Sequence, residues 1–255
     1  MSSKILIVRK IERLLNILRR KGVKHTVYWS IVKVYEQVGF RIFVPASLMY
    51  LYRGRRFGNY FEIAGKKYRY LYHRHNYSWR HERCVEVPII WDLVKKYTGR
   101  GKNVLEVGNV LINYYPVKHD VLDKYEIARN VINEDVVTFK PKKKYDLIVS
   151  ISTLEHVGWD EPKRDRMKIP RAIESLRGML SKSGKLVFTM PLGYNKFLDE
   201  LLASGKLKFN DTYYMKRISK DNQWVETSWD DVRDTKYGHS FIGANALVIG
   251  IVRPP

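Results

Sequence analysis

The sequence predicts a doubly wound α/β fold with a mostly parallel sheet, preceded by a basic helical extension. From residue 103 onward, apolar strand-like runs alternate with helical stretches, which is typical of a parallel sheet covered by helices. The last strand-like runs have no long helix between them, which favours antiparallel pairing at one edge of the sheet. The third observation is charge, because most of the net charge of +21 lies in the N-terminal part.

The uneven charge favours anionic partners. Residues 1–102 hold 23 Lys and Arg against 6 Asp and Glu, a net +17, whereas residues 103–255 hold 24 against 20, a net +4. Such a field attracts acidic lipid headgroups, RNA or a phosphorylated substrate. A thermophile-like composition, rich in Lys and poor in Gln and Cys, is an alternative source of the charge. It does not explain why one end of the chain takes most of the excess.

Residues 1–57 are expected to form a basic amphipathic helical extension. Apolar side chains recur at helical spacing over residues 4–21 and again over residues 27–38, with Lys and Arg between them. The apolar run 42–52 is too short to span a bilayer. Two interpretations stay open: a peripheral contact with an acidic membrane surface, or a helical subdomain packed on the main domain.

Targeting features and cysteine content favour a cytoplasmic protein. A peripheral location at the inner face of the membrane is the alternative. No signal peptide is evident, and no run reaches 18 apolar residues. The single cysteine, Cys84, excludes a disulfide framework.

Residues 58–102 are expected to form a hairpin (58–75) and a lead-in helix (84–97). Four potential metal ligands fall in this segment, but their spacing matches no common zinc finger, and no metal site is predicted. These ligands are His73, His75, His81 and Cys84. The arginines among them, Arg74, Arg80 and Arg83, would alternatively clamp a phosphate.

The main domain, residues 103–255, carries an ordered set of motifs. In order they are NVLEVG, VINEDVVTF, YDLIVSISTLEHVGW and AIESLRGMLSKSGKLVFTMPLGYN, and the most telling piece is LEHV after the fourth strand. In these motifs residues 103–252 resemble the class I S-adenosylmethionine-dependent methyltransferases, in particular the small-molecule branch that includes quinone methyltransferases. The resemblance implies a seven-stranded Rossmann-like sheet with S-adenosylmethionine as cofactor.

The expected cofactor residues follow the first strands, because ligands of such sheets bind outside the carboxyl ends of the strands. Gly108 lets the backbone approach the methionine part, and Glu106 either orients the loop or meets the amino group. Asp123, at the end of the second strand, is placed to accept hydrogen bonds from two ribose hydroxyls. The first loop departs from the family, since only its first glycine remains and Asn109 follows it. The helix after this loop must therefore be short or nearly absent.

By resemblance, Asp135 contacts the adenine amino group and the backbone near Val136 serves the ring nitrogen. The fifteen residues from Gly108 to Asp123 and the missing glycines leave open that the cofactor site is remodelled or lost.

The segment after the fourth strand carries the candidate catalytic residues. His156 titrates near neutrality and is the candidate base, with Glu155 beside it; the alternative is that His156 only supports the loop. Polar and aromatic residues of this loop and of the loop after the fifth strand are expected to contact the acceptor. These residues are Trp159, Asp160, Tyr194 and Asn195.

Three functions are consistent with the sequence. The first is methyl transfer to a small-molecule or glycan acceptor, lipid-linked or phosphorylated. The second is an RNA methyltransferase whose first 102 residues bind RNA, although no RNA-binding module is evident. The third is a non-catalytic protein that kept the fold. Cytosine C5 methylation is excluded, because the only thiol precedes the domain.

Overall fold

The structure, a computed structural model, describes residues 59–73 and 75–254, together with Val23. Residues 58–255 form one compact unit. The expectations for residues 1–57, a basic helical extension and its membrane contact, lie outside the described residues. Within the described part, no helix has the length and apolar character needed to cross a membrane.

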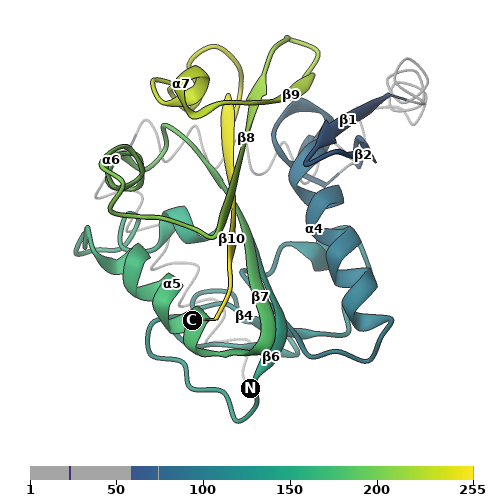
Figure 1. Cartoon of the computed structure of the whole chain (residues 1–255), viewed down its shortest axis with the longest axis vertical. Coiled ribbons are helices and arrows are strands. Elements are labelled where there is room, and N and C mark those ends of the chain that lie inside the picture. Colours follow the sequence, from purple (N-terminus) through teal and green to yellow (C-terminus); the bar gives the residue numbers. More distant parts are fainter. Residues whose placement is uncertain (1–22, 24–58, 74, 255) are drawn as a thin grey trace. The chain divides into compact units, whose positions relative to one another are not determined.

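An eight-stranded sheet forms the centre of this unit (Figure 1). Its strand order is β5-β4-β3-β6-β7-β10-β8-β9. The first five strands of that order are mutually parallel, and the last three are antiparallel to their neighbours. The strands are β3 (Val104–Val107), β4 (Asp120–Leu122), β5 (Val131–Ile132), β6 (Tyr145–Ile151), β7 (Leu180–Pro191), β8 (Asp211–Arg217), β9 (Trp224–Thr227) and β10 (Ala246–Val252).

This topology confirms the predicted fold class. The chain builds outward from β3 through β4 to β5, then returns to place β6 on the other side of β3, which is the order of a doubly wound sheet. The antiparallel edge is confirmed as well. The sheet has one strand more than the seven expected, because β9 pairs with the outer edge of β8.

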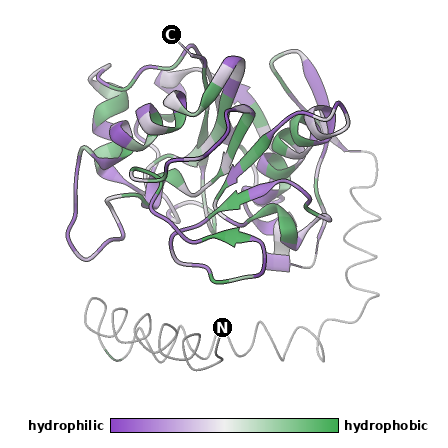
Figure 2. Ribbon diagram, turned by 90° about the horizontal axis from the view of Figure 1, so that it is seen from below, coloured by the Kyte–Doolittle hydropathy of each residue, from purple (hydrophilic) through white to green (hydrophobic). Residues whose placement is uncertain are grey.

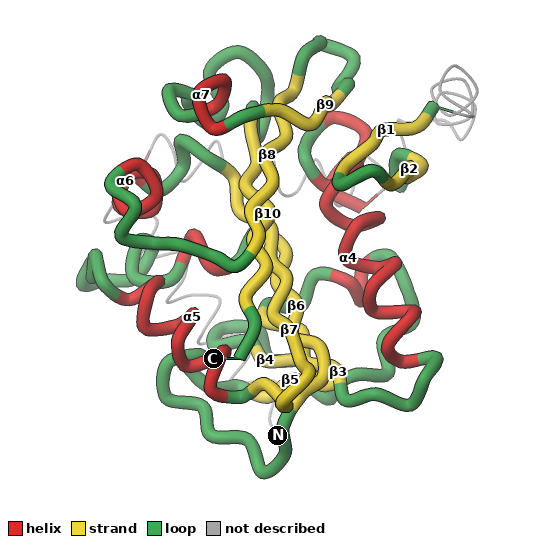
Figure 3. The backbone as a smooth tube through the Cα atoms, in the orientation of Figure 1, coloured by secondary structure: helices red, strands yellow, loops and turns green. Residues whose placement is uncertain are grey.

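Helices cover both faces of the sheet (Figures 1 and 3). The helices α5 (Lys168–Gly178) and α6 (Lys196–Ala203) pack with one core. The helix α4 (Arg83–Thr98) and the hairpin β1–β2 (Tyr60–Ile63, Lys66–Arg69) pack with the other. The short helix α7 (Trp229–Val232) contributes Val232 to the first core.

Strand β6 shows why these residues form a central strand. Leu147, Val149 and Ile151 enter the core on the α4 side, whereas Ile148 enters the core on the α5 side. A strand buried on both faces needs an almost continuous apolar run, and Figure 2 shows apolar strands at the centre of polar loops. The run Tyr145–Ile151 therefore gives the position of the strand from sequence.

The link between β3 and β4 contains a 3₁₀ turn, Leu111–Asn113, in place of an α-helix. This confirms the expectation of a short first helix. Because the link is compact, its side chains stay at the carboxyl edge of the sheet, where the candidate site lies.

Candidate functional site

The loops that bear the predicted site residues leave the sheet side by side. Val107 is paired with Leu122 on one side and with Ser150 on the other. The residues after these strands, beginning with Gly108 and Asp123, therefore start from one edge at the point where strand order reverses. Ligands of open α/β sheets bind at that point.

Gly108 is confined by both conformation and contact. Its φ is +87°, and a Cβ on it would lie 2.2 Å from Oγ1 of Thr153. The first loop therefore rests directly on the loop after β6. Among the first-loop positions Gly108 alone has a positive φ, so Asn109 does not take the left-handed conformation that the missing glycine suggested.

Glu106 is fully buried and engaged within the protein. One oxygen accepts hydrogen bonds from the amides of Val110 and Leu111, both at 2.8 Å, and the other lies 2.9 Å from Nε2 of His119. These contacts match the loop-orienting alternative for Glu106. Sequence reasoning missed His119, which follows Glu106 by thirteen residues and carries no motif.

One carboxylate oxygen of Asp123 is used in hydrogen bonds within its own loop, and the other is available to a ligand. Its Oδ1 accepts hydrogen bonds from the amides of Tyr125 and Glu126, both at 2.8 Å. Its Oδ2 has no hydrogen bond or ion pair among the described residues. The Glu126 carboxylate in turn accepts a hydrogen bond from Nδ2 of Asn109 at 3.0 Å, which joins the first two loops. The buried Oδ1 of Asn109 has no hydrogen-bond partner within the described residues.

Asp135 lies in an ion-pair cluster that the sequence did not indicate. Its Oδ2 lies 2.8 Å from Nζ of Lys124 and 2.7 Å from Nζ of Lys168, and its Oδ1 accepts a hydrogen bond from the amide of Val137. Burial opposes ionisation, but the two lysines outweigh it and hold the pKa of Asp135 well below its usual range. Lys168 also pairs with Glu161, so the cluster ties the loop after β5 to the loop after β6.

Val136 is buried in the core on the α5 side. Its main-chain N–H donates no hydrogen bond to any described residue. This N–H is therefore available for the expected contact with a ring nitrogen.

His156 is held by two groups on the substrate side. Its Nδ1 lies 2.6 Å from Oδ2 of Asp160, which also accepts a hydrogen bond from the Tyr194 hydroxyl at 2.6 Å. The Tyr194 ring lies edge-on to the imidazole, with centroids 5.0 Å apart. Burial lowers the pKa of His156, but Glu155 and Asp160 outweigh it, and the pKa is raised. The side chain is 46% exposed, so it remains accessible to an acceptor.

Glu155 is an almost completely buried acid beside this imidazole. Its Oε1 lies 3.5 Å from Nε2 of His156, and its Oε2 has no hydrogen-bond partner among the described residues. Burial raises the pKa of Glu155 to about 7. Glu155 therefore changes protonation near neutral pH, beside an imidazole whose pKa is raised, and two such neighbouring groups can exchange a proton.

The other two substrate candidates have different surroundings. Trp159 is half-buried and stacks between Arg164, whose guanidinium lies 4.0 Å from the ring centroid, and the edge of Phe197. Asn195 is buried; its Oδ1 caps α6, and its Nδ2 donates to the carbonyl of Glu155 at 2.7 Å. Its amide is thus used to hold Glu155 in place.

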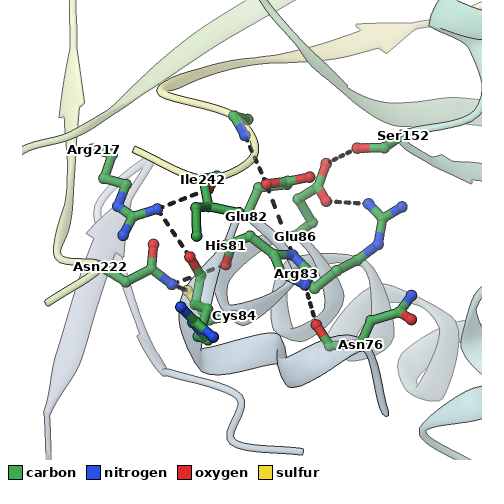
Figure 4. A network of polar contacts seen from close by, with 12 residues as sticks. Asn76, His81, Glu82, Arg83, Cys84, Glu86, Ser152, Arg217, Asn222 and Ile242 are labelled. Carbon is green, nitrogen blue, oxygen red and sulfur yellow. Dashed lines mark hydrogen bonds and ion pairs between the residues drawn. The ribbon is translucent and has the colours of Figure 1, made fainter. Parts of the chain in front are cut away.

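The N-terminal turn of α4 brings a buried ion pair to the same edge, and Figure 4 shows Glu86 with contacts to both Ser152 and Arg83. Oε1 of Glu86 accepts hydrogen bonds from the hydroxyls of Ser152 at 2.5 Å and Thr189 at 2.7 Å. Its other oxygen pairs with Arg83. The hydroxyl of Tyr114, buried nearby, has no hydrogen-bond partner within the described part, and burial raises its pKa to about 12. The one sequence signal for this group is Glu86 itself, an acid between apolar residues in the first half of the helix.

Two of the candidate metal ligands of residues 73–84 form hydrogen bonds within the protein. Cys84 is buried and accepts a hydrogen bond from Nδ2 of Asn222, and His81 contacts the carbonyl of Asn76. In the part of the chain that the structure describes, no three His, Cys, Asp or Glu side chains are grouped to hold a metal. Of the arginines proposed as a phosphate clamp, Arg83 pairs with Glu86, and Arg74 lies outside the described residues.

No family model and no curated protein matches the sequence. Solved structures that are similar to this chain are methyltransferases. The N-methyltransferase NodS from Bradyrhizobium japonicum, in complex with S-adenosyl-L-homocysteine, is 15% identical with a TM-score of 0.38, and the match covers 65% of this chain and 85% of NodS. A TehB-like S-adenosylmethionine-dependent methyltransferase from Corynebacterium glutamicum is 16% identical with a TM-score of 0.35, and the match covers 64% and 86%. The sugar N-methyltransferase KedS8 from Streptoalloteichus is 10% identical with a TM-score of 0.35, and the match covers 68% and 88%.

Proposed function

We propose that this protein transfers a methyl group from S-adenosylmethionine to a small-molecule or glycan acceptor. One observation carries the proposal. Gly108 and Asp123 follow two paired strands at the carboxyl edge of the sheet, where Asp123 keeps one carboxylate oxygen open and Asn109, linked to Asp123 through Glu126, keeps its buried Oδ1 unpartnered. Buried polar atoms are normally satisfied, so an orphaned atom at this edge is the kind of group that a bound ligand completes.

The residues present fit the cofactor. Oδ2 of Asp123 is available to accept from a ribose hydroxyl, Oδ1 of Asn109 to accept from the amino group, and the N–H of Val136 to donate to the adenine ring. Glu106 and Asp135 position the site without touching the cofactor. Glu106 orients the first loop through the amide of Val110, and Asp135 fixes the loop that would border the adenine through its ion pair with Lys124. When bound there, S-adenosylmethionine supplies an electrophilic methyl group.

On the substrate side, His156 accepts the proton that an acceptor hydroxyl loses. Asp160 accepts the hydrogen bond of Nδ1–H, which leaves Nε2 as the basic nitrogen. Glu155 faces that nitrogen from the buried side at 3.5 Å, and burial raises the pKa of Glu155 to about 7, so its carboxyl group can take up or release a proton near neutral pH. Trp159 and Tyr194 would border the acceptor.

The test is the affinity of the full-length protein for S-adenosylhomocysteine, measured by calorimetry for wild type and for Asp123→Asn. The substitution keeps an oxygen to cap Tyr125 and Glu126 but replaces the open acceptor with a donor. Loss of a hydrogen bond to a charged group predicts about 10- to 100-fold weaker binding.

Asp230→Asn, at an exposed position on α7, is the matched control and should bind as wild type does. If Asp123→Asn binds as tightly as the control, the cofactor assignment is wrong. If wild type itself does not bind, the interpretation as a non-catalytic relative replaces the proposal.

A further inference from the structure

A cavity of about 320 Å³ lies beside the end of β8, under the loop that leads into β10. Residues of that loop and the last two residues of β8 line it. Figure 3 shows loops gathered at this end of β8 and β10. Neither the sequence motifs nor the proposed methyl-transfer site uses this cavity.

The lining is predominantly basic. Lys216, Arg217, Lys236 and His239 stand against a single acid, Asp234. Lys236 and His239 are exposed to solvent, so they can reorient toward a ligand. A concave surface with an excess of positive charge concentrates anions.

Arg217 supplies a fixed positive charge in the wall. It is 6% exposed, and its guanidinium donates to main-chain carbonyls that include those of Arg80 at 2.9 Å and Ile242 at 3.1 Å (Figure 4). It also lies 4.4 Å from the ring centroid of Phe241. The charge is therefore held in one position beside the cavity.

The remaining lining groups suit a hydroxylated ring. Asn245 is 6% exposed; its Nδ2 donates to the carbonyl of Lys236 at 2.8 Å, and its Oδ1 has no partner among the described residues. A buried amide oxygen without a partner calls for a donor such as a hydroxyl. Thr235 and Ser240 add hydroxyls, and Phe241 adds an aromatic face.

The cavity is linked directly to the proposed catalytic side chains. A Cβ on Gly193, in the loop after β7, would lie 2.2 Å from the carbonyl oxygen of Thr235. Two residues later, the ring of Tyr237 lies edge-on to Tyr194, with centroids 5.1 Å apart, and Tyr194 contacts His156. The loop that lines the cavity thus also borders the site of methyl transfer.

We infer that this cavity binds an anionic sugar: a ring of hexose size whose hydroxyls meet Asn245 and whose phosphate or carboxylate meets Lys216 and Lys236. The inference rests on the proposed function in one respect, namely that the bound sugar is part of the acceptor. The volume exceeds what a lone phosphate fills, and the lining combines fixed charge, hydroxyl partners and an aromatic face.

The test titrates the full-length protein with glucose 6-phosphate and with glucuronate. Inorganic phosphate, which has the charge without the ring, and glucose, which has the ring without the charge, serve as comparison ligands. The variant is the double substitution Lys216→Ala and Lys236→Ala. The control is Lys163→Ala with Lys182→Ala, two exposed lysines outside the cavity whose loss changes the net charge equally. We expect wild type to bind at least one anionic sugar, with about tenfold or greater weakening in the variant and none beyond about twofold in the control.

Tighter binding of glucose 6-phosphate than of glucuronate identifies phosphate as the anionic group, and the reverse identifies carboxylate. The inference is overturned if neither sugar binds at millimolar concentration, if inorganic phosphate binds as well as the sugars, or if variant and control weaken alike. The affinity of the variant for S-adenosylhomocysteine should equal that of wild type. A cavity that binds sugar in a protein that fails to bind S-adenosylhomocysteine would contradict the proposed function and leave the sugar site standing.

Discussion

Replacing Glu86 by Ala is expected to lower the free energy of unfolding by about 3–5 kcal/mol, the cost of breaking a buried ion pair. Glu86 is fully buried, and it pairs with Arg83 while accepting the hydroxyl hydrogen bonds of Ser152 and Thr189. Its loss leaves a mostly buried guanidinium without its carboxylate and two buried hydroxyls without their acceptor. Urea unfolding of the full-length protein measures the change.

The control for this prediction is Glu62→Ala. Glu62 forms a single ion pair with Lys67 at 3.3 Å, and its side chain is 60% exposed. Exposed pairs of this kind contribute about 0–1 kcal/mol. Equal losses in the two variants would mean that the Glu86 network does not hold α4 against the carboxyl edge of the sheet.

The second large effect is a pH dependence that originates at Glu155. Burial raises the pKa of this acid from 4.5 to about 7. The folded state therefore favours the neutral form of Glu155, so the contribution of this group to stability is largest below pH 4.5 and is lost as the pH rises through the folded pKa. The shift corresponds to about 3 kcal/mol of stability lost between about pH 4 and pH 8.

Glu155→Gln removes this ionisation. The unfolding free energy of the variant relative to wild type should rise by about 3 kcal/mol over the same range, in urea titrations at several pH values. Comparison with wild type cancels the titration of Asp199, another buried acid, whose pKa is raised to about 6. Glu174→Gln, at an exposed position of α5, should show no such rise. A flat difference for Glu155→Gln would show that the carboxyl ionises normally in the fold.

The sequence was most informative where burial on both faces forces an apolar run. Strands β4, β6 and β10 coincide with runs of mostly apolar residues in the sequence, and each strand ends where its apolar residues end. The short link after β3 followed from the spacing between Gly108 and Asp123.

Partner side chains could not be predicted in the same way. Glu86 contacts Ser152 and Thr189, which lie 66 and 103 residues away along the chain. Lys168 reaches Asp135 from α5 across 33 residues. Such contacts depend on how helices pack against the sheet, and no local pattern encodes them.

The cavity beside β8 was also beyond sequence reasoning. Its lining comes mostly from a polar loop, and such composition by itself is typical of a solvated surface. The hollow of about 320 Å³ and the buried Asn245 distinguish it, and both are properties of the folded chain.

The central claim is that S-adenosylmethionine binds at the carboxyl edge of the sheet. Hydrogen exchange of the full-length protein with and without S-adenosylhomocysteine tests it most directly, because the method reports both that a ligand binds and which residues it protects. At ligand about 100-fold above its dissociation constant, amides that exchange only after the site opens should slow by about 100-fold, which corresponds to about 2.7 kcal/mol. We predict this protection in residues 108–113, 123–126 and 133–138, the loops after β3, β4 and β5. Protection confined to other segments, or none at millimolar ligand, would contradict the assignment of a cofactor site to the carboxyl edge of this sheet.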